Sequence, residues 1–207
     1  MKLKFQNQTI KLLPSGGLFI INKNILIIAD LHLGKGVQLQ DNAIPLINQI
    51  DTPTLAKLKN DIQQYNPLTC IICGDLFHAD SPHIKEQIHW FEEEIKSLPC
   101  NFILTIGNHD TYLKKYHLKH IKTQAQVTVD HIICSHYKQT LHPSISGHIH
   151  PGIKIKKGKI INYYKAFAIN NQHIICPSYG FYTGHFTKIN PSMTLYYIKN
   201  NVIIKHL

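Results

Sequence analysis

The chain has 207 residues, of which 43% are hydrophobic, and its 22 basic and 12 acidic residues give a formal net charge of +10. This hydrophobic fraction excludes a disordered chain, and the length favours one domain over residues 1–207. No apolar run approaches the ~18 residues of a membrane-spanning helix. No signal-peptide pattern follows residues 1–6, so we expect a soluble protein of the cytoplasm.

Every one of the 22 basic residues is Lys. Lys is a flexible point charge without the planar fork of Arg, so it holds phosphates but does not grip guanine edges bidentately. If the partner is a nucleic acid, we expect attraction to the phosphate backbone with little reading of sequence. The charge alone leaves a second interpretation open, in which the lysines only form a solvated surface.

The five cysteines are an odd number, and four of them lie in expected strand cores, where reduced thiols are usual. Cys70 and Cys73 have the spacing of a thiolate pair, but no second pair follows. Alternation along a strand would point these two side chains to opposite faces. We therefore expect no disulfide bond.

The first half of the chain combines short strands with amphipathic helices. Antiparallel strands are expected at residues 2–5, 9–13, 18–21 and 25–28. Helices are expected from Asp51 and after Pro82, and a shorter one after Asp110. The first two carry apolar stripes that would cover a sheet. The stripes are Leu55, Leu58, Ile62 and Tyr65, and then Ile84, Ile88, Phe91, Ile95 and Leu98, with Glu92, Glu93 and Glu94 mostly outward.

Beyond residue 124 the pattern changes to strands. They are expected at residues 126–129, 131–134, 152–155, 159–169, 173–176, 193–198 and 202–206. Helix-flanked strands followed by mainly antiparallel strands predict an α/β fold with two packed, mixed β-sheets flanked by helices.

Five segments, four of which are apolar runs, lead into side chains that bind metal ions. The central run, residues 71–73, leads into Gly74, Asp75 and then His78. The other four lead into Asp30 and His32, into Asn108, His109 and Asp110, into His136, and into His148 and His150. Strands of α/β sheets deliver ligands at their carboxyl ends, so we expect one shared site. A single Asp or His is more often a loop or cap residue, but five such clusters in order favour a metal centre.

Two of these clusters place their ligands two residues apart. Asp30 and His32 form one such pair, and His148 and His150 form the other. In an extended segment, residues i and i+2 project to the same side, as two ligands of one ion must. We therefore expect extended backbone at both pairs.

This series of motifs resembles the signature of the calcineurin-like metallophosphoesterase superfamily, which is D-x-H, G-D-x-x-H, G-N-H-[DE], a lone His and G-H-x-H. The resemblance implies a four-layer αββα sandwich and two divalent metal ions. It implies that one ion is held by Asp30, His32, Asp75 and His150, and the other by Asp75, Asn108, His136 and His148. Asp75 would then bridge the two ions.

The chemistry of these side chains agrees with such a centre. Carboxylate, imidazole and amide ligands without thiolate suit Mn²⁺, Fe²⁺ or Zn²⁺, and we expect Mn²⁺. Two such ions roughly 3.5 to 4 Å apart acidify a shared water, which would attack the phosphorus as a bridging hydroxide. His109 is expected to protonate the leaving oxygen or to neutralise its charge. Asp110 is expected to orient that imidazole, to cap the following helix, or both.

A closer resemblance comes from longer segments, which match the ligase-associated DNA damage response endonuclease family of bacterial phosphoesterases. These segments are residues 29–36, 43–45, 74–78, 146–152 and 177–184. The resemblance implies a phosphodiesterase that acts on single-stranded DNA and is functionally linked to a DNA ligase and a DEXH-box helicase. His78, Lys35 and Asn108 are the expected substrate contacts. The chain departs from the family in the neutral to acidic residues 38–42, where Arg is usual, and in Tyr137.

Two alternatives to a nuclease remain open. The first is a phosphoesterase acting on a small nucleotide or sugar phosphate, which would bind its substrate tightly at high salt. The second is a non-catalytic scaffold on the same fold. The presence of every expected ligand argues against the scaffold.

Overall fold

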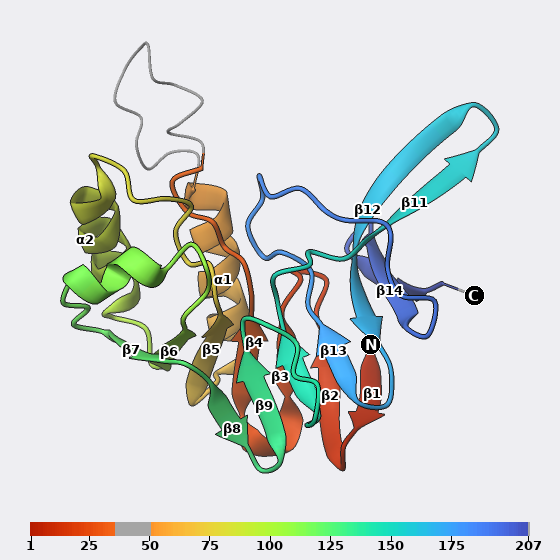
Figure 1. Cartoon of the computed structure of the whole chain (residues 1–207), viewed down its shortest axis with the longest axis horizontal. Coiled ribbons are helices and arrows are strands. Elements are labelled where there is room, and N and C mark those ends of the chain that lie inside the picture. The colour runs from red at the N-terminus through yellow and green to blue at the C-terminus, as the bar shows by residue number, and fades with distance from the viewer. Residues whose placement is uncertain (36–50, 207) are drawn as a thin grey trace.

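The first of two β-sheets has seven strands in the order β1-β2-β3-β4-β5-β6-β7 (Figure 1). The computed structural model describes residues 1–35 and 51–206, so residues 36–50, which hold the segments 38–42 and 43–45 discussed above, lie outside the described residues. The strands of this sheet are Lys2–Phe5, Gln8–Leu12, Leu18–Ile20, Ile25–Ile28, Thr69–Cys73, Asn101–Thr105 and Ile121–Gln124. Neighbours are antiparallel from β1 to β4 and parallel from β4 to β7.

The second sheet has eight strands. Its order is β15-β14-β12-β13-β10-β9-β8, and β11 pairs with β12 outside this path. In chain order from β8 to β15 the strands are Val127–Val129, Ile132–Ser135, Ser144–Ser146, Gly152–Lys157, Ile160–Ile169, His173–Ile175, Thr194–Lys199 and Val202–Lys205. The strands β9, β10 and β13 are parallel. The β11–β12 hairpin projects away from the two sheets (Figure 1).

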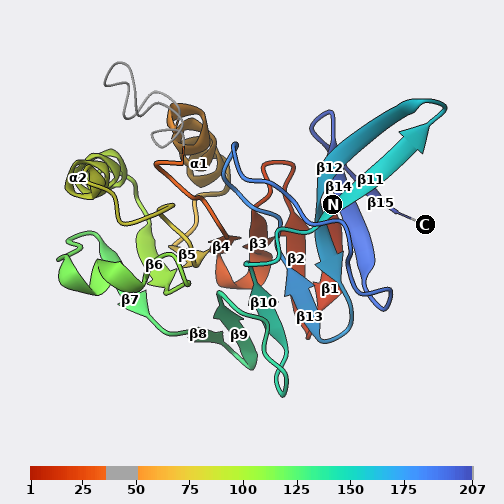
Figure 2. The same ribbon diagram turned by 45° about the horizontal axis from the view of Figure 1, so that its top comes forward.

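Two α-helices cover one face of the first sheet, and the second sheet packs on the other face (Figure 2). The helices are α1, Thr52–Tyr65, and α2, Ile84–Ile95, and the described 3₁₀ helices are Ile21–Lys23 and Thr111–Lys115. Strand alternation divides the apolar side chains between the layers. Ile28 and Cys70 pack against the helices, whereas Ile27 and Cys73 pack between the sheets. The opposite directions of Cys70 and Cys73 are as predicted.

The α/β class, the two mixed sheets and the helices after Asp51 and Pro82 are confirmed. Two strands were not predicted. Strand β7 buries only Ile121, because it is the edge of its sheet, and β10 consists of Ile145 between two serines. Such short strands carry little apolar pattern.

Two finer expectations are corrected. The outer helical layer on the second sheet, the fourth layer of the predicted sandwich, is not formed by the described residues, whose α-helices both pack on the first sheet. Glu92 is not outward but buried, because its carboxylate accepts hydrogen bonds from the backbone N–H groups of Lys119 and His120.

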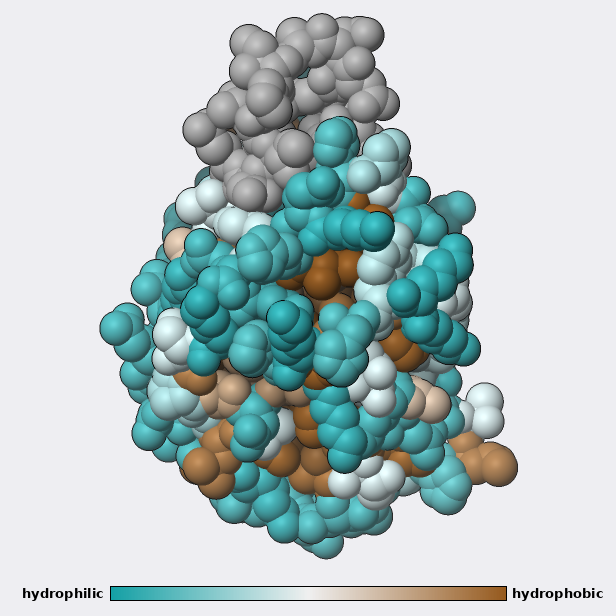
Figure 3. All heavy atoms as spheres, turned by 90° about the vertical axis from the view of Figure 1, so that its left-hand side faces the viewer, coloured by the Kyte–Doolittle hydropathy of each residue, from teal (hydrophilic) through white to brown (hydrophobic). Residues whose placement is uncertain are grey.

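The surface on the side of α2 is largely hydrophilic, with apolar side chains visible in the hollows between polar ones (Figure 3). The lysines near the third helix, which are Lys114, Lys115, Lys119 and Lys122, are exposed. Neither described α-helix has the length and hydrophobicity that a membrane-spanning helix needs. The five cysteines are all free.

Candidate metal centre

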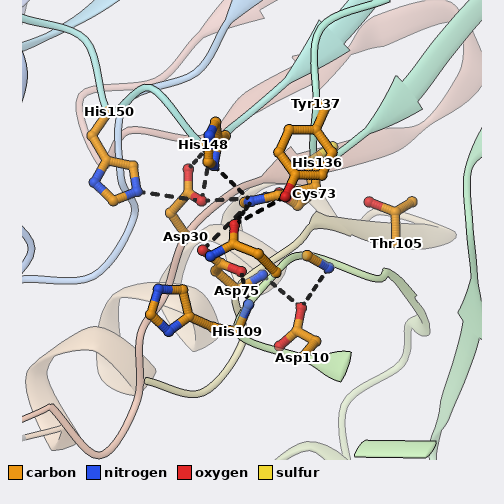
Figure 4. A network of polar contacts seen from close by, with 12 residues as sticks. Asp30, Cys73, Asp75, Thr105, His109, Asp110, His136, Tyr137, His148 and His150 are labelled. Carbon is orange, nitrogen blue, oxygen red and sulfur yellow. Dashed lines mark hydrogen bonds and ion pairs between the residues drawn. The ribbon is translucent and has the colours of Figure 1, made fainter. Parts of the chain in front are cut away.

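The polar side chains that follow the strands of both sheets meet at one place (Figure 4). The first sheet supplies Asp30 after β4, Asp75 after β5 and Asn108 after β6. The second sheet supplies His136 after β9, and His148 and His150 after β10. Because β4, β5 and β6 are parallel, their carboxyl ends lie at the same edge of the first sheet. The structure therefore brings the predicted ligands together across the two sheets.

The spacing alone had suggested an extended backbone at the paired ligands. The backbone there is not extended. Asp30 and His32 have φ values of +53° and +47°, and His148 and His150 have +69° and +49°. Asp75 shares this left-handed conformation with a φ of +52°. Non-glycine residues adopt it rarely and at a cost of about 1 to 3 kcal/mol, and such strain concentrates at functional sites. Each ligand pair thus reaches the site from a sharp turn rather than from a strand.

One group of ligand atoms comes from four residues. The Nε2 atoms of His32 and His150 are 3.4 Å apart, and His150 Nε2 lies 3.4 Å from Asp30 Oδ1. His32 Nε2 lies 3.6 Å from Asp75 Oδ2. Two ligands that are each about 2.1 Å from one ion stand roughly 3.0 to 3.4 Å apart, so this group has nearly the spacing of a coordination shell.

A second group shares Asp75 with the first. His136 Nε2 lies 3.5 Å from Asp75 Oδ2, 2.9 Å from Asn108 Oδ1 and 3.1 Å from His148 Nδ1. Asp75 Oδ2 is therefore close to an imidazole of each group. This is the arrangement that a carboxylate bridging two ions requires.

The orientation of His136 fits a metal ligand. Its Nδ1 lies 3.2 Å from the carbonyl oxygen of Cys73, which only accepts hydrogen bonds, so the ring proton sits on Nδ1. The lone pair of Nε2 is then directed at Asn108, Asp75 and His148, which offer further lone pairs. Metal-bound histidines are commonly oriented by such a contact to a carbonyl group.

Burial shifts the ionisation of the same residues. It lowers the pKa of His32 to about 2, and it also lowers the pKa of His136. It raises the pKa values of Asp30 and Asp75. Neutral imidazoles expose the lone pairs that bind metals, and buried carboxylates need positive charge nearby. Divalent cations satisfy both requirements, so the donor set fits the two ions that the motifs imply.

Glycines in the motifs leave room for the ligands. A Cβ at Gly107 would lie 2.2 Å from Asp75 Oδ1, and one at Gly147 would lie 2.4 Å from Asp30 Oδ2. A Cβ at Gly74 would lie 2.2 Å from Nδ1 of His136. Any side chain at these positions would displace a ligand.

Asp110 acts on the backbone rather than on the imidazole of His109. Its two carboxylate oxygens accept hydrogen bonds from the backbone N–H groups of Asp75, Leu76 and Gly107 at 2.6, 2.9 and 2.9 Å. The side chain makes no cap hydrogen bond to the following 3₁₀ helix. The structure thus corrects both roles expected for Asp110, which instead holds the turn that presents Asp75.

His109 lies over the ligand cluster without joining the two groups above. Its ring is 5.1 Å from that of His32 and is stacked on that of His78 at 5.5 Å. His109 Nδ1 lies 2.5 Å from the carbonyl oxygen of His78, so Nδ1 donates this hydrogen bond and Nε2 is the nitrogen available for proton transfer. The expected roles of His109 as acid and of His78 as a phosphate contact remain predictions.

Lys35 lies near the same histidines. Its backbone N–H donates to the carbonyl oxygen of His32 at 3.3 Å. Burial lowers the pKa of His78, and the positive charge of Lys35 lowers it further. The expected contact of Lys35 with the substrate remains a prediction.

Tyr137 was noted in the sequence only as a departure from the family pattern, but it is part of the site. Its ring lies 4.7 Å from the rings of both His136 and His148, and its hydroxyl donates to Asn108 Oδ1 at 3.3 Å. The side chain is 48% exposed, so a ring that contacts two ligands also faces solvent. Its position directly after a ligand was the one available signal.

The chain is similar to a known family and to solved structures. The calcineurin-like phosphoesterase family matches residues 23–201. A nuclease, MPE, from Pseudomonas putida has a similar structure, with a TM-score of 0.76 and 21% identity over 100% of this chain and 99% of that one. The phosphoesterase Yfce from E. coli shows a TM-score of 0.44 and 15% identity over 87% of this chain and 96% of that one. A search of curated proteins found no match.

Two packed mixed sheets with a cluster of Asp, Asn and His ligands at their strand ends define a metal-dependent phosphoesterase. The chain belongs to the calcineurin-like phosphoesterase family, whose members bind divalent metal ions.

Proposed function

We propose that this phosphoesterase is a two-metal phosphodiesterase that cleaves single-stranded DNA as an endonuclease. The observation that carries the proposal is the position of Asp75, whose Oδ2 lies 3.6 Å from His32 Nε2 and 3.5 Å from His136 Nε2. One carboxylate shared by two ligand groups fits a pair of ions acting on one phosphate. The proposal includes Mn²⁺ as the working ion, a role in DNA repair, location in the cytoplasm and a functional link to a DNA ligase and a DEXH-box helicase.

The protein residues provide positioning and proton transfer. When bound, two divalent ions supply Lewis acidity and an acidified water. Asp75, held by Asp110, fixes the shared ligand atom, while His109 offers its Nε2 to the leaving oxygen of the substrate. Protonation matters most for a poor leaving group such as the sugar alkoxide of DNA.

A nucleic-acid substrate is supported by charge and by similarity. The net charge of +10 attracts a polyanion, and the absence of Arg agrees with binding to backbone phosphates rather than to base edges. The structurally similar P. putida protein is described as a nuclease.

The test compares three substrates for the Mn²⁺-loaded protein, namely a single-stranded oligonucleotide, the same sequence as a duplex, and bis(p-nitrophenyl) phosphate. We expect internal cleavage of the single strand, slower cleavage of the duplex, and no activity in an Asp75→Asn control. Hydrolysis of the small ester alone, with both oligonucleotides intact, would reject the DNA substrate and favour a small phosphoester. If the parent protein is as inactive as the control on all three, the chain is a scaffold.

A further inference from the structure

The β11–β12 hairpin has two chemically different faces. Residues paired directly across an antiparallel ladder lie on the same face. Lys154 pairs with Tyr163, Lys156 with Ile161, and Gly152 with Lys165. We call the face that these six residues form the lysine–tyrosine face. The opposite face carries Ile153, Ile155, Lys157, Ile160, Asn162 and Tyr164.

The lysine–tyrosine face is open to solvent along most of its length. Tyr163 is 53% exposed, and Lys154 and Lys156 beside it are exposed. Neither lysine takes part in an ion pair with any described residue. Tyr163 therefore presents a large aromatic ring beside two ammonium groups that no described carboxylate pairs with.

Further lysine and aromatic side chains lie at the base of the hairpin. Lys165 Nζ donates to the carbonyl oxygens of Ser178, at 2.8 Å, and of Gly180. Tyr163 and Lys165 line one groove together with Lys57 and Phe181, and Lys57 Nζ lies 4.8 Å from the centre of the Phe181 ring. Phe181 is itself 54% exposed. Lysine side chains and aromatic rings thus continue from the hairpin to its base.

The same face is connected to the metal centre by short contacts. The ring of Tyr163 lies 5.8 Å from that of His185, whose side chain fills the space that a Cβ at Gly152 would occupy. The next residue, Phe186, donates its backbone N–H to the carbonyl oxygen of the ligand His150 at 2.8 Å. A nucleic-acid strand bound to the hairpin would therefore pass close to the loop that carries His150.

We propose that the lysine–tyrosine face binds single-stranded nucleic acid next to the cleaved phosphate, with Lys154 and Lys156 on backbone phosphates and Tyr163 stacked on a base. Proteins bind single strands without reading sequence through this combination of a positive track and aromatic platforms. A duplex keeps its bases stacked internally, so only a single strand can use Tyr163. The inference rests on the proposed DNA substrate and names the surface that selects it.

The first test compares the loss of two charges on the lysine–tyrosine face with the loss of two charges on the opposite side of the hairpin. The double variant Lys154→Gln/Lys156→Gln removes the two exposed lysine charges of the lysine–tyrosine face. Its matched control, Lys157→Gln/Lys199→Gln, removes the same charge from the other side, where Lys199 lies 5.7 Å from the ring of Tyr164. For oligonucleotide cleavage, kcat/KM of the first variant should be several-fold lower than that of the parent. The slope of log kcat/KM against log salt should become shallower by about 1.4, because each phosphate contact on a single strand contributes about 0.7 to the slope.

The second test addresses stacking. Tyr163→Ala should lower kcat/KM for the single-stranded oligonucleotide about fivefold or more, because one stacked base contributes about 1 to 3 kcal/mol. Tyr163→Phe keeps the ring and should restore cleavage. Hydrolysis of bis(p-nitrophenyl) phosphate reports on folding and on the metal centre. Its rate should be the same in the two double lysine variants and in the two Tyr163 variants.

The outcomes separate this inference from the proposed function. If the parent cleaves the oligonucleotide and both double variants lose the same amount of activity and salt dependence, the lysine–tyrosine face does not bind the substrate. Equal cleavage by Tyr163→Ala and the parent would likewise exclude stacking. If the parent hydrolyses the small ester but neither binds nor cleaves the oligonucleotide, the DNA substrate and this surface fail together.

Discussion

The carboxylate of Asp110 accepts a hydrogen bond from the backbone N–H of Asp75 at 2.6 Å, and Asp75 holds a left-handed φ of +52°. Two further backbone N–H groups, of Leu76 and Gly107, donate to the same carboxylate. Asp110 is fully buried, and burial raises its pKa to about 6. The turn that presents the shared metal ligand is therefore held by a residue that belongs to neither ligand group.

Replacing Asp110 should weaken metal binding without removing a ligand. In Asp110→Asn, an NH₂ group faces backbone N–H groups in place of an acceptor, which should lower the free energy of unfolding by about 1 to 3 kcal/mol. Mn²⁺ affinity should fall because the turn at Asp75 loosens. Urea unfolding and metal titration measure the two effects. Asp80→Asn is the control, since its exposed carboxylate lies 3.6 Å from Lys115, and equal effects in both variants would contradict the assignment.

One substitution should remove the metal ions from both ligand groups. Asp75→Asn removes the charge that both groups share, so we expect the loss of both ions or a strong loss of affinity at both positions. His78→Ala should keep its metal and slow turnover instead. Elemental analysis of the purified variants gives the metal stoichiometry. Equal metal loss in both would show that His78 acts as a ligand.

Gly147 should tolerate no side chain. In Gly147→Ala the new Cβ would lie 2.4 Å from Asp30 Oδ2 and 2.9 Å from the carbonyl oxygen of Cys73, so the ligand or the backbone must move. We expect reduced stability and metal content, measured by thermal unfolding and elemental analysis. The same substitution at Gly184, which has no atom within 4 Å of the Cβ position, should leave both unchanged. A fully loaded Gly147→Ala protein would argue against the observed packing.

The effect of removing His109 should depend on the leaving group. A proton donor contributes typically 10²–10⁴-fold when the departing oxygen is strongly basic. His109→Ala should therefore slow DNA cleavage by about that factor and slow release of p-nitrophenolate far less. Comparison of kcat for the two substrates measures the difference. Equal loss on both would assign His109 a role in positioning.

Lys57 should make stability depend on pH. Burial, and then the positive charge of Lys165, lower the pKa of Lys57 from its ordinary value of 10.5 to about 7. Between these values the unfolded chain binds more protons than the folded chain, so the free energy of unfolding should rise with pH. Urea unfolding at pH 7 and pH 9 should show a larger rise for the parent than for Lys57→Met. An equal rise in both would show that Lys57 is charged and solvated when folded.

The sequence by itself determined the class of the fold and the chemistry of the site. Short apolar runs ending in Asp, Asn and His can be recognised without coordinates, because the buried strand and the ligand that follows it are adjacent in the chain. The donor types follow from the same residues, and they exclude a thiolate site. The amphipathic stripes of α1 and α2 were readable for the same reason, since their period lies within one segment.

Only the tertiary structure decided how these parts meet. Asp30 and His150 are 3.4 Å apart although 120 positions separate them, because strands of two different sheets end at one place. The turns at the ligands, the hydrogen bonds of Asp110 and the position of Tyr137 over two histidines depend on such distant contacts. Local spacing wrongly suggested extended backbone at Asp30 and His32. The left-handed turns there are held by neighbours far away in the chain, which no local pattern records.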